Sequence, residues 1–402
     1  MLNSRYMEMT RHENVIRRVF MYGKKRAAEI GYDNVFDYSL GNPSVAAPES
    51  FHRALTDILA TQDDLTVHGY SPSLGIGSVR QAVAASLNRR FEMKYEEKHI
   101  FMTSGAAGAV AHALRAVLEE PGDEILTFAP YFPEYKPYVE GAGGRLVVTP
   151  ANTEDFQIHF EAFSELLNPR VKGVLINTPN NPAGVIYSAK TLKRLAGILT
   201  EKQKEYGHSI YIISDEPYRE LVFDGIRIPY TASFYANTFT CYSFSKSLSI
   251  PGERIGYVAV HPDSEDAETA AAVFGQISRE IGHNCPPSLM QLAIAPCLED
   301  TSDLSVYEEN KEILFRELQD LGYSCVKPQG TFYMFPRSLE PDDTAFCERA
   351  KKYELLLVPG SAFGCPGHFR ISYCIPTEKV IRSLPAFRRL AEEYPVGERR
   401  RL

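Results

Sequence analysis

A lysine among hydroxyl-bearing residues is the first pattern in this sequence that indicates chemistry. Lys246 is flanked by Ser245 and Ser247, follows Ser243 by three residues and precedes Arg254 by eight. An amine acts as a nucleophile and base once its pKa is lowered, which a cationic, partly desolvated site can do. Lysines are commonplace in exposed loops, but the three hydroxyls and the arginine make this pattern more specific.

A carboxylate and a phenol follow a predicted strand at residues 210–214. Asp215 comes directly after the strand, and Tyr218 comes three residues later. Ligands of open α/β sheets bind at the carboxyl ends of the strands, where this pair is expected. A lone aspartate in such a place is more often a solvated residue that caps the next turn.

Small residues open a predicted helix at Ser104–Gly108. The unpaired N–H groups at the start of a helix form an anion site, so this run is a candidate for binding phosphate. Small residues also suit close helix packing, which makes the run a weak signal by itself. Gly75 and Gly77 resemble the beginning of a dinucleotide fingerprint, but the third glycine and a preceding strand are missing.

Short apolar runs alternate with helical patterns between about residues 100 and 260. Most of the runs are continuous, as in strands that helices cover on both faces, so the sequence predicts an α/β sandwich. Ser104 and Ser188 are predicted N-caps of two of the helices. The predicted strands are Ile125–Ala129, Arg145–Thr149, Val174–Thr178, Ile210–Ser214, Thr238–Ser243 and Ile255–Val260.

The two ends of the chain have a different pattern. Beyond about residue 285, a helical stretch at Ser305–Leu321 and an apolar run at Thr331–Phe335 predict a second, smaller α+β domain, followed by a basic tail at Arg399–Arg401. Residues 1–30 carry basic side chains as a transit peptide does, but acidic residues are interspersed and apolar ones recur at helical spacing. An amphipathic helix packed on the body is expected there.

Composition excludes several classes of protein. The 402 residues carry a formal net charge of −8, so no global positive field attracts nucleic acid, and no apolar stretch reaches the ~18 residues of a membrane span. Seven cysteines are scattered and never spaced as Cys-x-x-Cys, which predicts reduced thiols in a cytoplasmic protein without a metal site or a disulfide framework.

Together the motifs resemble the class I/II aminotransferases, pyridoxal-phosphate enzymes of fold type I, the aspartate aminotransferase fold. The resemblance implies a three-layer α/β/α large domain with a mostly parallel sheet at 46–284, and a small discontinuous α+β domain built from 1–45 and 285–402. The similar segments extend over nearly the whole chain and are Gly41–Ser44, Tyr70 with Gly75, Ser104–Ala106, Asn180–Gly184, Asp215–Tyr218, Ser243–Arg254 and Phe369–Ser372.

The resemblance assigns the chemistry of the cofactor, pyridoxal 5'-phosphate, to four residues. Lys246 would form the Schiff base and later shuttle a proton between the substrate Cα and the cofactor. Asp215 would pair with the pyridine nitrogen and keep it protonated. Tyr218 and Asn181 would donate to the phenolate oxygen from its two sides.

The resemblance also implies a phosphate site and a stacking partner. The phosphate would be held by the amides of Gly105, Ala106 and Ala107, the hydroxyls of Ser243 and Ser245, and Arg254. Ala107 departs from many relatives, which carry a hydroxyl or a lysine there, so it can offer only its backbone. In a chain without tryptophan, Phe132 would stack on the pyridine ring, with Tyr131 as the substitute.

Further implied residues come from the chain ends and from a second subunit. Arg370 would clamp the substrate α-carboxylate with two parallel bonds, Gly41 would let the backbone approach the substrate, and Asn181 would also contact it. Tyr70 would reach the phosphate of the neighbouring subunit. The resemblance therefore implies a homodimer.

The implied activity is an aminotransferase of amino-acid metabolism, which moves an amino group between an L-amino acid and a 2-oxo acid by a ping-pong mechanism. The alternative is a pyridoxal-phosphate-dependent C–S lyase that performs β-elimination on the same scaffold. The segment Asp215–Glu220 looks more like the aspartate aminotransferase branch. A pyridoxal-phosphate-sensing transcription regulator would need a DNA-binding module, and we expect no room for one before Gly41.

Overall fold

The computed structural model describes residues 2–11 and 14–395, which form two compact units. Unit 1 consists of the described residues of 1–44 together with 182–184 and those from 305 onward, and unit 2 consists of 45–181 and 185–304. The predicted basic tail at Arg399–Arg401 lies outside the described residues.

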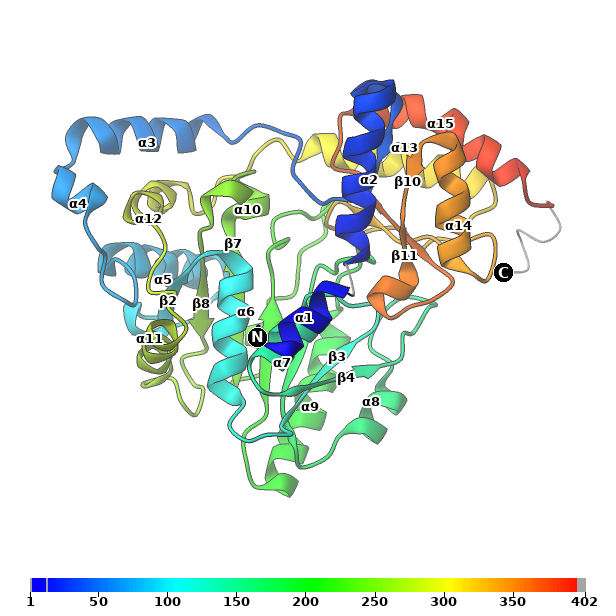
Figure 1. The fold of residues 1–402 in the computed structure, drawn as a ribbon. Coiled ribbons are helices and arrows are strands. Elements are labelled where there is room, and N and C mark those ends of the chain that lie inside the picture. The colour runs from blue at the N-terminus through cyan, green and yellow to red at the C-terminus, as the bar shows by residue number, and fades with distance from the viewer. Residues whose placement is uncertain (1, 12–13, 396–402) are drawn as a thin grey trace. The chain divides into compact units, whose positions relative to one another are not determined.

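Unit 2 is built on a seven-stranded sheet with the strand order β2-β8-β7-β6-β5-β3-β4. Only β8 runs against its neighbours β2 and β7, so the mostly parallel sheet expected from the sequence is confirmed. Figure 1 labels the strands, which are β2 (Ile100–Thr103), β3 (Glu124–Phe128), β4 (Arg145–Thr149), β5 (Val171–Asn177), β6 (Tyr211–Asp215), β7 (Thr238–Ser243) and β8 (Gly256–Val260).

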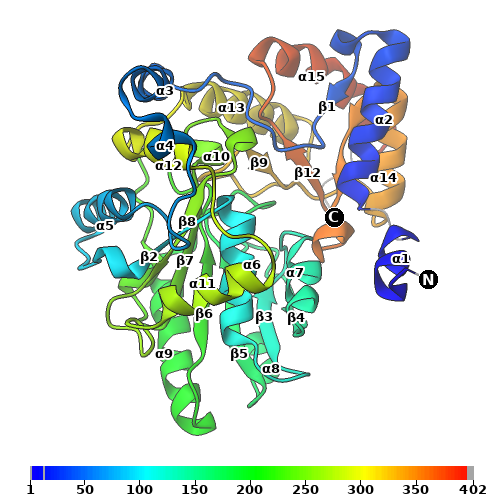
Figure 2. The same cartoon turned by 60° about the vertical axis from the view of Figure 1, so that its left-hand side comes forward.

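Both faces of this sheet are buried by helices, which gives the three predicted layers. Ile125 and Ile213 pack on one face with α6 (Gly105–Val117), α7 (Tyr135–Gly141) and α11 (Ala270–Glu280). Their neighbours Leu126 and Ile212 pack on the other face with α8 (Phe160–Leu166) and α9 (Ala189–Tyr206), because successive side chains of a strand point to opposite faces. Figure 2 shows α6 and α11 in front of the strands.

The predicted elements agree with the structure at most positions. Two predicted strands coincide with β4 and β7, and the other four differ from β3, β5, β6 and β8 by one to three residues at one or both ends. Ser188 caps α9, since its hydroxyl accepts a hydrogen bond from the Thr191 amide at 3.1 Å. Ser104 occupies the N-cap of α6 without a side-chain capping bond. Strand β2 was missed because four residues show too little periodicity to separate a strand from a helix.

The rest of unit 2 is a helical layer that includes residues predicted to belong to the smaller domain. Met290, Ile294 and Cys297 pack in the same apolar cluster as Phe51 and Ala54. Residues 285–304 therefore lie with unit 2, which differs from the predicted boundary at 284/285. The helices of this layer are α3 (Glu49–Thr61), α4 (Asp64–His68), α5 (Gly77–Phe91), α10 (Phe244–Ser247) and α12 (Ser288–Ile294).

Unit 1 combines short strands with five helices of the described chain. A three-stranded sheet has the order β11-β12-β9, and β1 pairs with β10 in parallel. Its strands are β1 (Phe36–Asp37), β9 (Tyr333–Met334), β10 (Leu355–Leu356), β11 (Val358–Pro359) and β12 (Phe369–Ser372). Its helices are α1 (Ser4–Arg11), α2 (Val15–Ile30), α13 (Ser305–Asp320), α14 (Asp343–Ala350) and α15 (Thr377–Glu392).

The expected amphipathic N-terminal helix is two helices with different surroundings. Val19 of α2 is buried against Val35 and Leu356, so α2 packs on unit 1 as expected. Helix α1 buries none of its residues, which corrects the expectation of a packed helix for that part of the chain. Among the described residues, no helix has the length and apolar character that crossing a membrane requires.

Candidate active site

The ends of three neighbouring strands bring the predicted site residues of unit 2 together. Asn177, Asp215 and Ser243 are the last residues of β5, β6 and β7. Asp215 lies beside Asn177 in the pairing of β5 with β6, and beside Cys241 in the pairing of β6 with β7. The three strands are parallel, so their carboxyl ends lie along one edge, where open α/β sheets bind ligands.

Asp215 is buried with one carboxylate oxygen held and the other open. The Tyr135 hydroxyl donates to Asp215 Oδ2 at 2.6 Å, whereas Oδ1 has no hydrogen-bond partner among the described residues. Burial raises the pKa of Asp215 to about 7, the hydrogen bond from Tyr135 opposes that rise, and the charge of Glu216 adds to it. A cation beside Oδ1 would compensate the buried charge and lower this pKa.

Asn177 connects Asp215 to Asn181. Its side-chain amide donates to the main-chain oxygen of Asp215 at 2.8 Å, and its Oδ1 accepts from the Asn181 amide at 2.6 Å. Asn177 and Asn181 are both buried. One side chain thereby ties the end of β6 to the turn that carries Asn181.

Lys246 lies on α10, directly after β7. The hydroxyl of Ser243 caps this short helix by accepting from the Ser245 amide at 3.2 Å. The ammonium nitrogen of Lys246 lies 5.9 Å from the centroid of the buried Tyr218 ring. The predicted lysine and the predicted phenol therefore face each other across the strand ends.

An arginine and two serine hydroxyls gather at the start of α6. The hydroxyls of Ser243 and Ser245 lie 2.8 Å apart, and Arg254 Nη1 lies 3.5 Å from the Ser245 hydroxyl. Arg254 also donates to the main-chain oxygens of Pro251 at 2.8 Å and Ser104 at 3.3 Å. Three predicted phosphate ligands thus lie beside the helix N-terminus, whose N–H groups favour an anion.

Two glycines allow this close arrangement. Gly105 has a φ of +78°, which side chains other than glycine rarely adopt, and a Cβ there would lie 3.0 Å from Arg254 Nη2. A Cβ on Gly256 would overlap the Tyr242 carbonyl oxygen and lie 2.9 Å from the Cα of Gly105. The chain can therefore bring the start of α6 against β8 only because both positions lack a side chain.

The remaining predicted residues of unit 2 occupy the same loops or the surface. Ala106 and Ala107 lie in the first turn of α6. Phe132 and Tyr131 are half-buried before α7, and the Phe132 ring packs against the edge of the Tyr135 ring at 5.7 Å. Tyr70 is fully exposed at 101% and is not brought to the strand ends within this chain.

Gly41 and Arg370 belong to unit 1 and are described there. Arg370 is 2% exposed, its guanidinium lies 4.6 Å from the centroid of the Tyr333 ring, and it donates to the main-chain oxygen of Ser39. A Cβ on Gly41 would overlap the Tyr333 hydroxyl. Tyr333 therefore contacts both predicted substrate residues of this unit.

Sequence reasoning missed two residues that donate hydrogen bonds to Asp215. Tyr135 and Asn177 were not singled out, although Asn177 lies one residue before the end of the predicted strand Val174–Thr178 and ends β5 in the structure. The position at the strand end could have indicated Asn177. Nothing in the spacing marks Tyr135, which is 80 residues from its partner.

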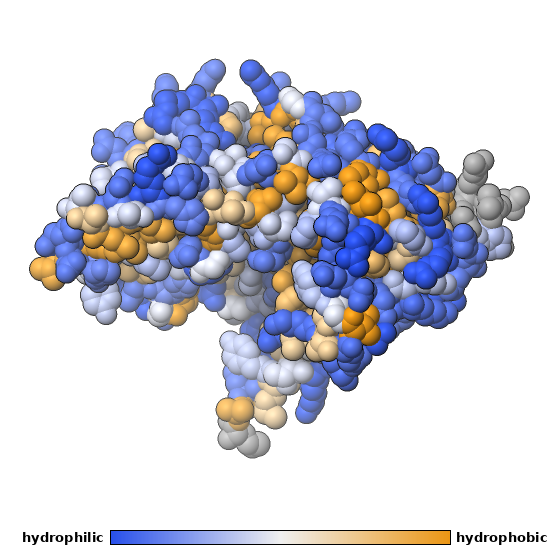
Figure 3. Space-filling model, turned by 90° about the horizontal axis from the view of Figure 1, so that it is seen from above, coloured by the Kyte–Doolittle hydropathy of each residue, from blue (hydrophilic) through white to orange (hydrophobic). Residues whose placement is uncertain are grey.

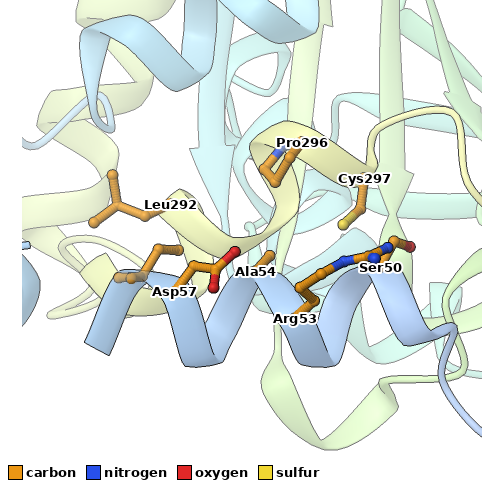
Figure 4. Close-up of a pocket in the computed structure, with 8 residues that line it drawn as sticks. Ser50, Arg53, Ala54, Asp57, Leu292, Pro296 and Cys297 are labelled. Carbon is orange, nitrogen blue, oxygen red and sulfur yellow. The ribbon is translucent and has the colours of Figure 1, made fainter. Parts of the chain in front are cut away.

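A pocket elsewhere in unit 2 has no predicted site residue in its lining. It has a volume of about 360 Å³ and lies between α3 and the segment from α12 to the 3₁₀ turn η5 (Ala295–Cys297). Figure 4 shows Ser50, Arg53 and Asp57 along α3, opposite Leu292, Pro296 and Cys297. The described residues contain no group of three or more acidic, histidine or cysteine side chains that could hold a metal ion.

Comparison with known proteins identifies similar chains over almost the full length. The family model of aminotransferase class I and II matches residues 33–386. A probable aspartate/prephenate aminotransferase of Aquifex aeolicus is 31% identical over 379 residues, which cover 90% of this chain and 92% of that protein.

Solved structures agree with this result. A crystal structure of an amino transferase from Eubacterium rectale has a TM-score of 0.96 and 44% identity, covering 98% of this chain and 99% of that one. The aspartate aminotransferase of Thermotoga maritima has a TM-score of 0.85 and 28% identity, covering 94% and 97%. These proteins are aminotransferases by name, and none of the three is named as a C–S lyase.

Proposed function

We propose that the strand-end cluster of unit 2 is the active site of this chain, which belongs to the class I and II aminotransferases. These enzymes act with pyridoxal 5'-phosphate and exchange an amino group between an amino acid and a 2-oxo acid. In this proposal Lys246 is the residue that binds the cofactor and moves the proton. The observation that supports the proposal is that Oδ1 of the buried Asp215 has no hydrogen-bond partner among the described residues. The same cluster contains the amine of Lys246 and the groups beside the start of α6 that favour an anion.

The residues present fit pyridoxal 5'-phosphate. Burial raises the pKa of the Asp215 carboxylate, and a cationic ring nitrogen would compensate its buried charge. Asp215 Oδ1 is available to accept a hydrogen bond from the protonated ring nitrogen. The hydroxyls of Ser243 and Ser245, Arg254 and the amides of Gly105, Ala106 and Ala107 would hold the phosphate. When bound, the cofactor supplies a ring that accepts electrons from the substrate Cα.

Each residue of the cluster would then have a separate task. Asp215 holds a proton on the ring nitrogen, and Tyr135 keeps Asp215 Oδ2 occupied so that Oδ1 serves the ring. Lys246 binds the cofactor and transfers a proton at the substrate Cα. Tyr218 and Asn181 donate to the ring oxygen, and the Phe132 ring stacks on the pyridine face.

For the substrate we propose Arg370 as the ligand of the α-carboxylate. Its guanidinium is buried, lies against the rings of Tyr333 and Phe363, and presents a planar fork that suits a carboxylate. Gly41 would contact the substrate through its backbone, and Asn181 would contact it through its side chain. An ammonium at position 370 would lose the two parallel bonds, so Arg370→Lys should raise the KM for every amino acid tested.

A half-reaction screen tests the proposed site. Purified holoenzyme is mixed with single amino acids, and conversion of the lysine-linked cofactor to its amino form is followed by visible absorption. Lys246→Ala should lose the lysine-linked absorption and the turnover, whereas Lys190→Ala, which removes an exposed lysine of α9, should retain both. A Lys246→Ala protein that keeps both would overturn the proposal.

We also propose that the working protein is a cytoplasmic homodimer in which Tyr70 serves the partner's site. Tyr70 is fully exposed, and Leu59 and Leu65 nearby in the chain are 56% and 82% exposed. Figure 3 shows apolar side chains scattered among polar ones on the face in view. All seven cysteines are free, as in a reducing compartment. Cell fractionation tests the location.

Subunit mixing tests the dimer. A heterodimer of Lys246→Ala and Tyr70→Ala subunits contains one site with both residues intact if Tyr70 acts across the interface. Mixing the two inactive or impaired variants should therefore restore activity to at most half of the wild-type value. If mixing restores nothing although the chains form heterodimers, Tyr70 does not act in this way.

A further inference from the structure

A charged cluster is buried in the segment that directly follows Asp215. The carboxylate of Glu216 pairs with Arg219 at 2.9 Å, and the two side chains are only 2% and 1% exposed. The Ser214 hydroxyl donates to Glu216 at 2.7 Å, and Arg219 donates to the Tyr257 hydroxyl at 3.0 Å. The segment that follows Asp215 is therefore held by ionic contacts within the core.

The Tyr242 ring packs against the arginine of this cluster. The guanidinium carbon of Arg219 lies 4.5 Å from the centroid of the Tyr242 ring, which attracts a cation through its face. The Tyr242 ring also packs against Phe244 and Tyr257, each with a centroid distance of 5.1 Å. A phenylalanine would preserve these ring contacts, so packing alone does not require the hydroxyl.

The Tyr242 hydroxyl lies between the two segments that carry the proposed catalytic residues. It donates to Glu220 Oε2 at 2.6 Å, and it lies 3.0 Å from the Ser247 hydroxyl. Glu220 ends the segment that begins at Asp215, and Ser247 follows Lys246 in α10. Arg90 binds the other oxygen of Glu220 at 2.8 Å, which fixes that carboxylate.

We propose that Tyr242 is a positioning residue, whose hydroxyl couples Glu220 to Ser247 and so sets Lys246 relative to the segment of Asp215 and Tyr218. The inference rests on the proposed function. The single phenolic proton lies between two acceptors, the Glu220 carboxylate at 2.6 Å and the Ser247 hydroxyl oxygen at 3.0 Å. Burial and the charge of Glu220 hold the pKa of Tyr242 well above its usual range, so the phenol remains a donor.

The test is Tyr242→Phe with Tyr235→Phe as its matched control. Tyr235 is also a buried phenol with two hydrogen bonds, to Gln203 at 2.9 Å and to the Ile210 oxygen at 2.8 Å, but it packs in a separate apolar cluster with α8 and α9. A small displacement of a reacting group lowers the reaction rate strongly. Tyr242→Phe should therefore lower kcat about ten- to hundred-fold while the KM changes little. Tyr235→Phe should lower only the Tm.

A spectroscopic readout separates positioning from plain stability. The visible absorption of the bound cofactor, titrated with pH, should shift in Tyr242→Phe because Lys246 and Tyr218 no longer keep their relative positions. It should coincide with the wild-type curve in Tyr235→Phe. If both variants lose the same Tm and keep wild-type kcat and titration curves, Tyr242 is not a positioning residue.

A second variant keeps the test decisive if Tyr242→Phe does not fold. Ser247→Ala deletes only the link between Tyr242 and α10 and leaves the bond of Tyr242 to Glu220 in place. It should reproduce the fall in kcat and the shifted titration, and wild-type values for both would overturn the proposal. An active Lys246→Ala protein would instead overturn the proposed function itself.

Discussion

The hydroxyl of Tyr135 occupies one oxygen of Asp215 at 2.6 Å and leaves the other without a partner among the described residues. Both side chains are buried, and burial followed by the charge of Asp215 holds the pKa of Tyr135 well above its usual range. The phenol therefore stays protonated and fixes which carboxylate oxygen can serve a ring nitrogen. The sequence motif around Asp215 does not indicate which of the two carboxylate oxygens is available.

Tyr135→Phe should weaken Asp215 as the partner of the cofactor. The hydrogen bond from Tyr135 opposes the rise in the pKa of Asp215, so its loss raises that pKa further. A hydrogen bond to a charged group contributes about 1.5–3 kcal/mol, and kcat should fall at least ten-fold. Steady-state kinetics measure this. Tyr187→Phe, which removes a buried phenol from the core on the opposite face, should keep the wild-type kcat; equal rates in both variants would contradict the role of Tyr135.

Asp215 should make the cofactor-free protein less stable as the pH rises. Its pKa is about 7 in the folded chain and near 4 in an unfolded one, so its contribution is present below about pH 4 and is lost as the pH rises through 7. Asp215→Asn cannot ionise. The Tm of the wild-type apoprotein, compared with that of Asp215→Asn, should therefore decline between pH 4 and 8 by the equivalent of a few kcal/mol. If the Tm of the two proteins changes with pH in parallel, the pKa of Asp215 is not raised in the folded protein.

Asn177→Leu should lower both stability and cofactor affinity. The change removes the partners of the Asp215 oxygen and the Asn181 amide, and each unsatisfied buried group costs about 1–3 kcal/mol. Spectroscopic titration with pyridoxal 5'-phosphate and thermal unfolding measure the two effects.

The control for Asn177 is Thr127→Val. Thr127 also makes a buried side-chain bond to the main chain of the sheet, to the Leu175 oxygen at 2.8 Å. Its loss should lower the Tm and leave the cofactor affinity unchanged. The same loss of affinity in both variants would mean that Asn177 acts only through the stability of the sheet.

Gly256→Ala should disturb the start of α6. The new Cβ would overlap the Tyr242 carbonyl oxygen and press on Gly105, and overpacking of this kind costs about 1–3 kcal/mol. The Tm and the affinity for pyridoxal 5'-phosphate should both fall. Gly252→Ala adds a Cβ with no atom within 4 Å and should change stability by less than about 0.5 kcal/mol. A Gly256→Ala protein with wild-type affinity would show that the start of α6 does not depend on this contact.

The layered fold and the types of residue at the proposed site could be predicted from the amino-acid sequence. Continuous apolar runs predicted buried strands, and Asp215 and Lys246 follow two of the predicted strands in the sequence. Such signals are local, because the pattern that predicts a strand, a helix cap or a loop lies within a few consecutive residues. The boundary near residue 285 was misplaced, since the packing of α12 against α3 is a contact between distant segments.

The contacts that hold those residues could not be predicted, because they form only in the folded chain. Tyr135 reaches Asp215 across 80 positions, Asn177 joins two loops, and Tyr242 lies between Glu220 and Ser247. A buried tyrosine or asparagine carries no spacing signal, because its partner is chosen by the order of the strands and not by its neighbours in the chain. The physical reason is that a buried polar group must find a partner wherever the fold offers one. The partner is a neighbour in space, and it can lie anywhere in the sequence.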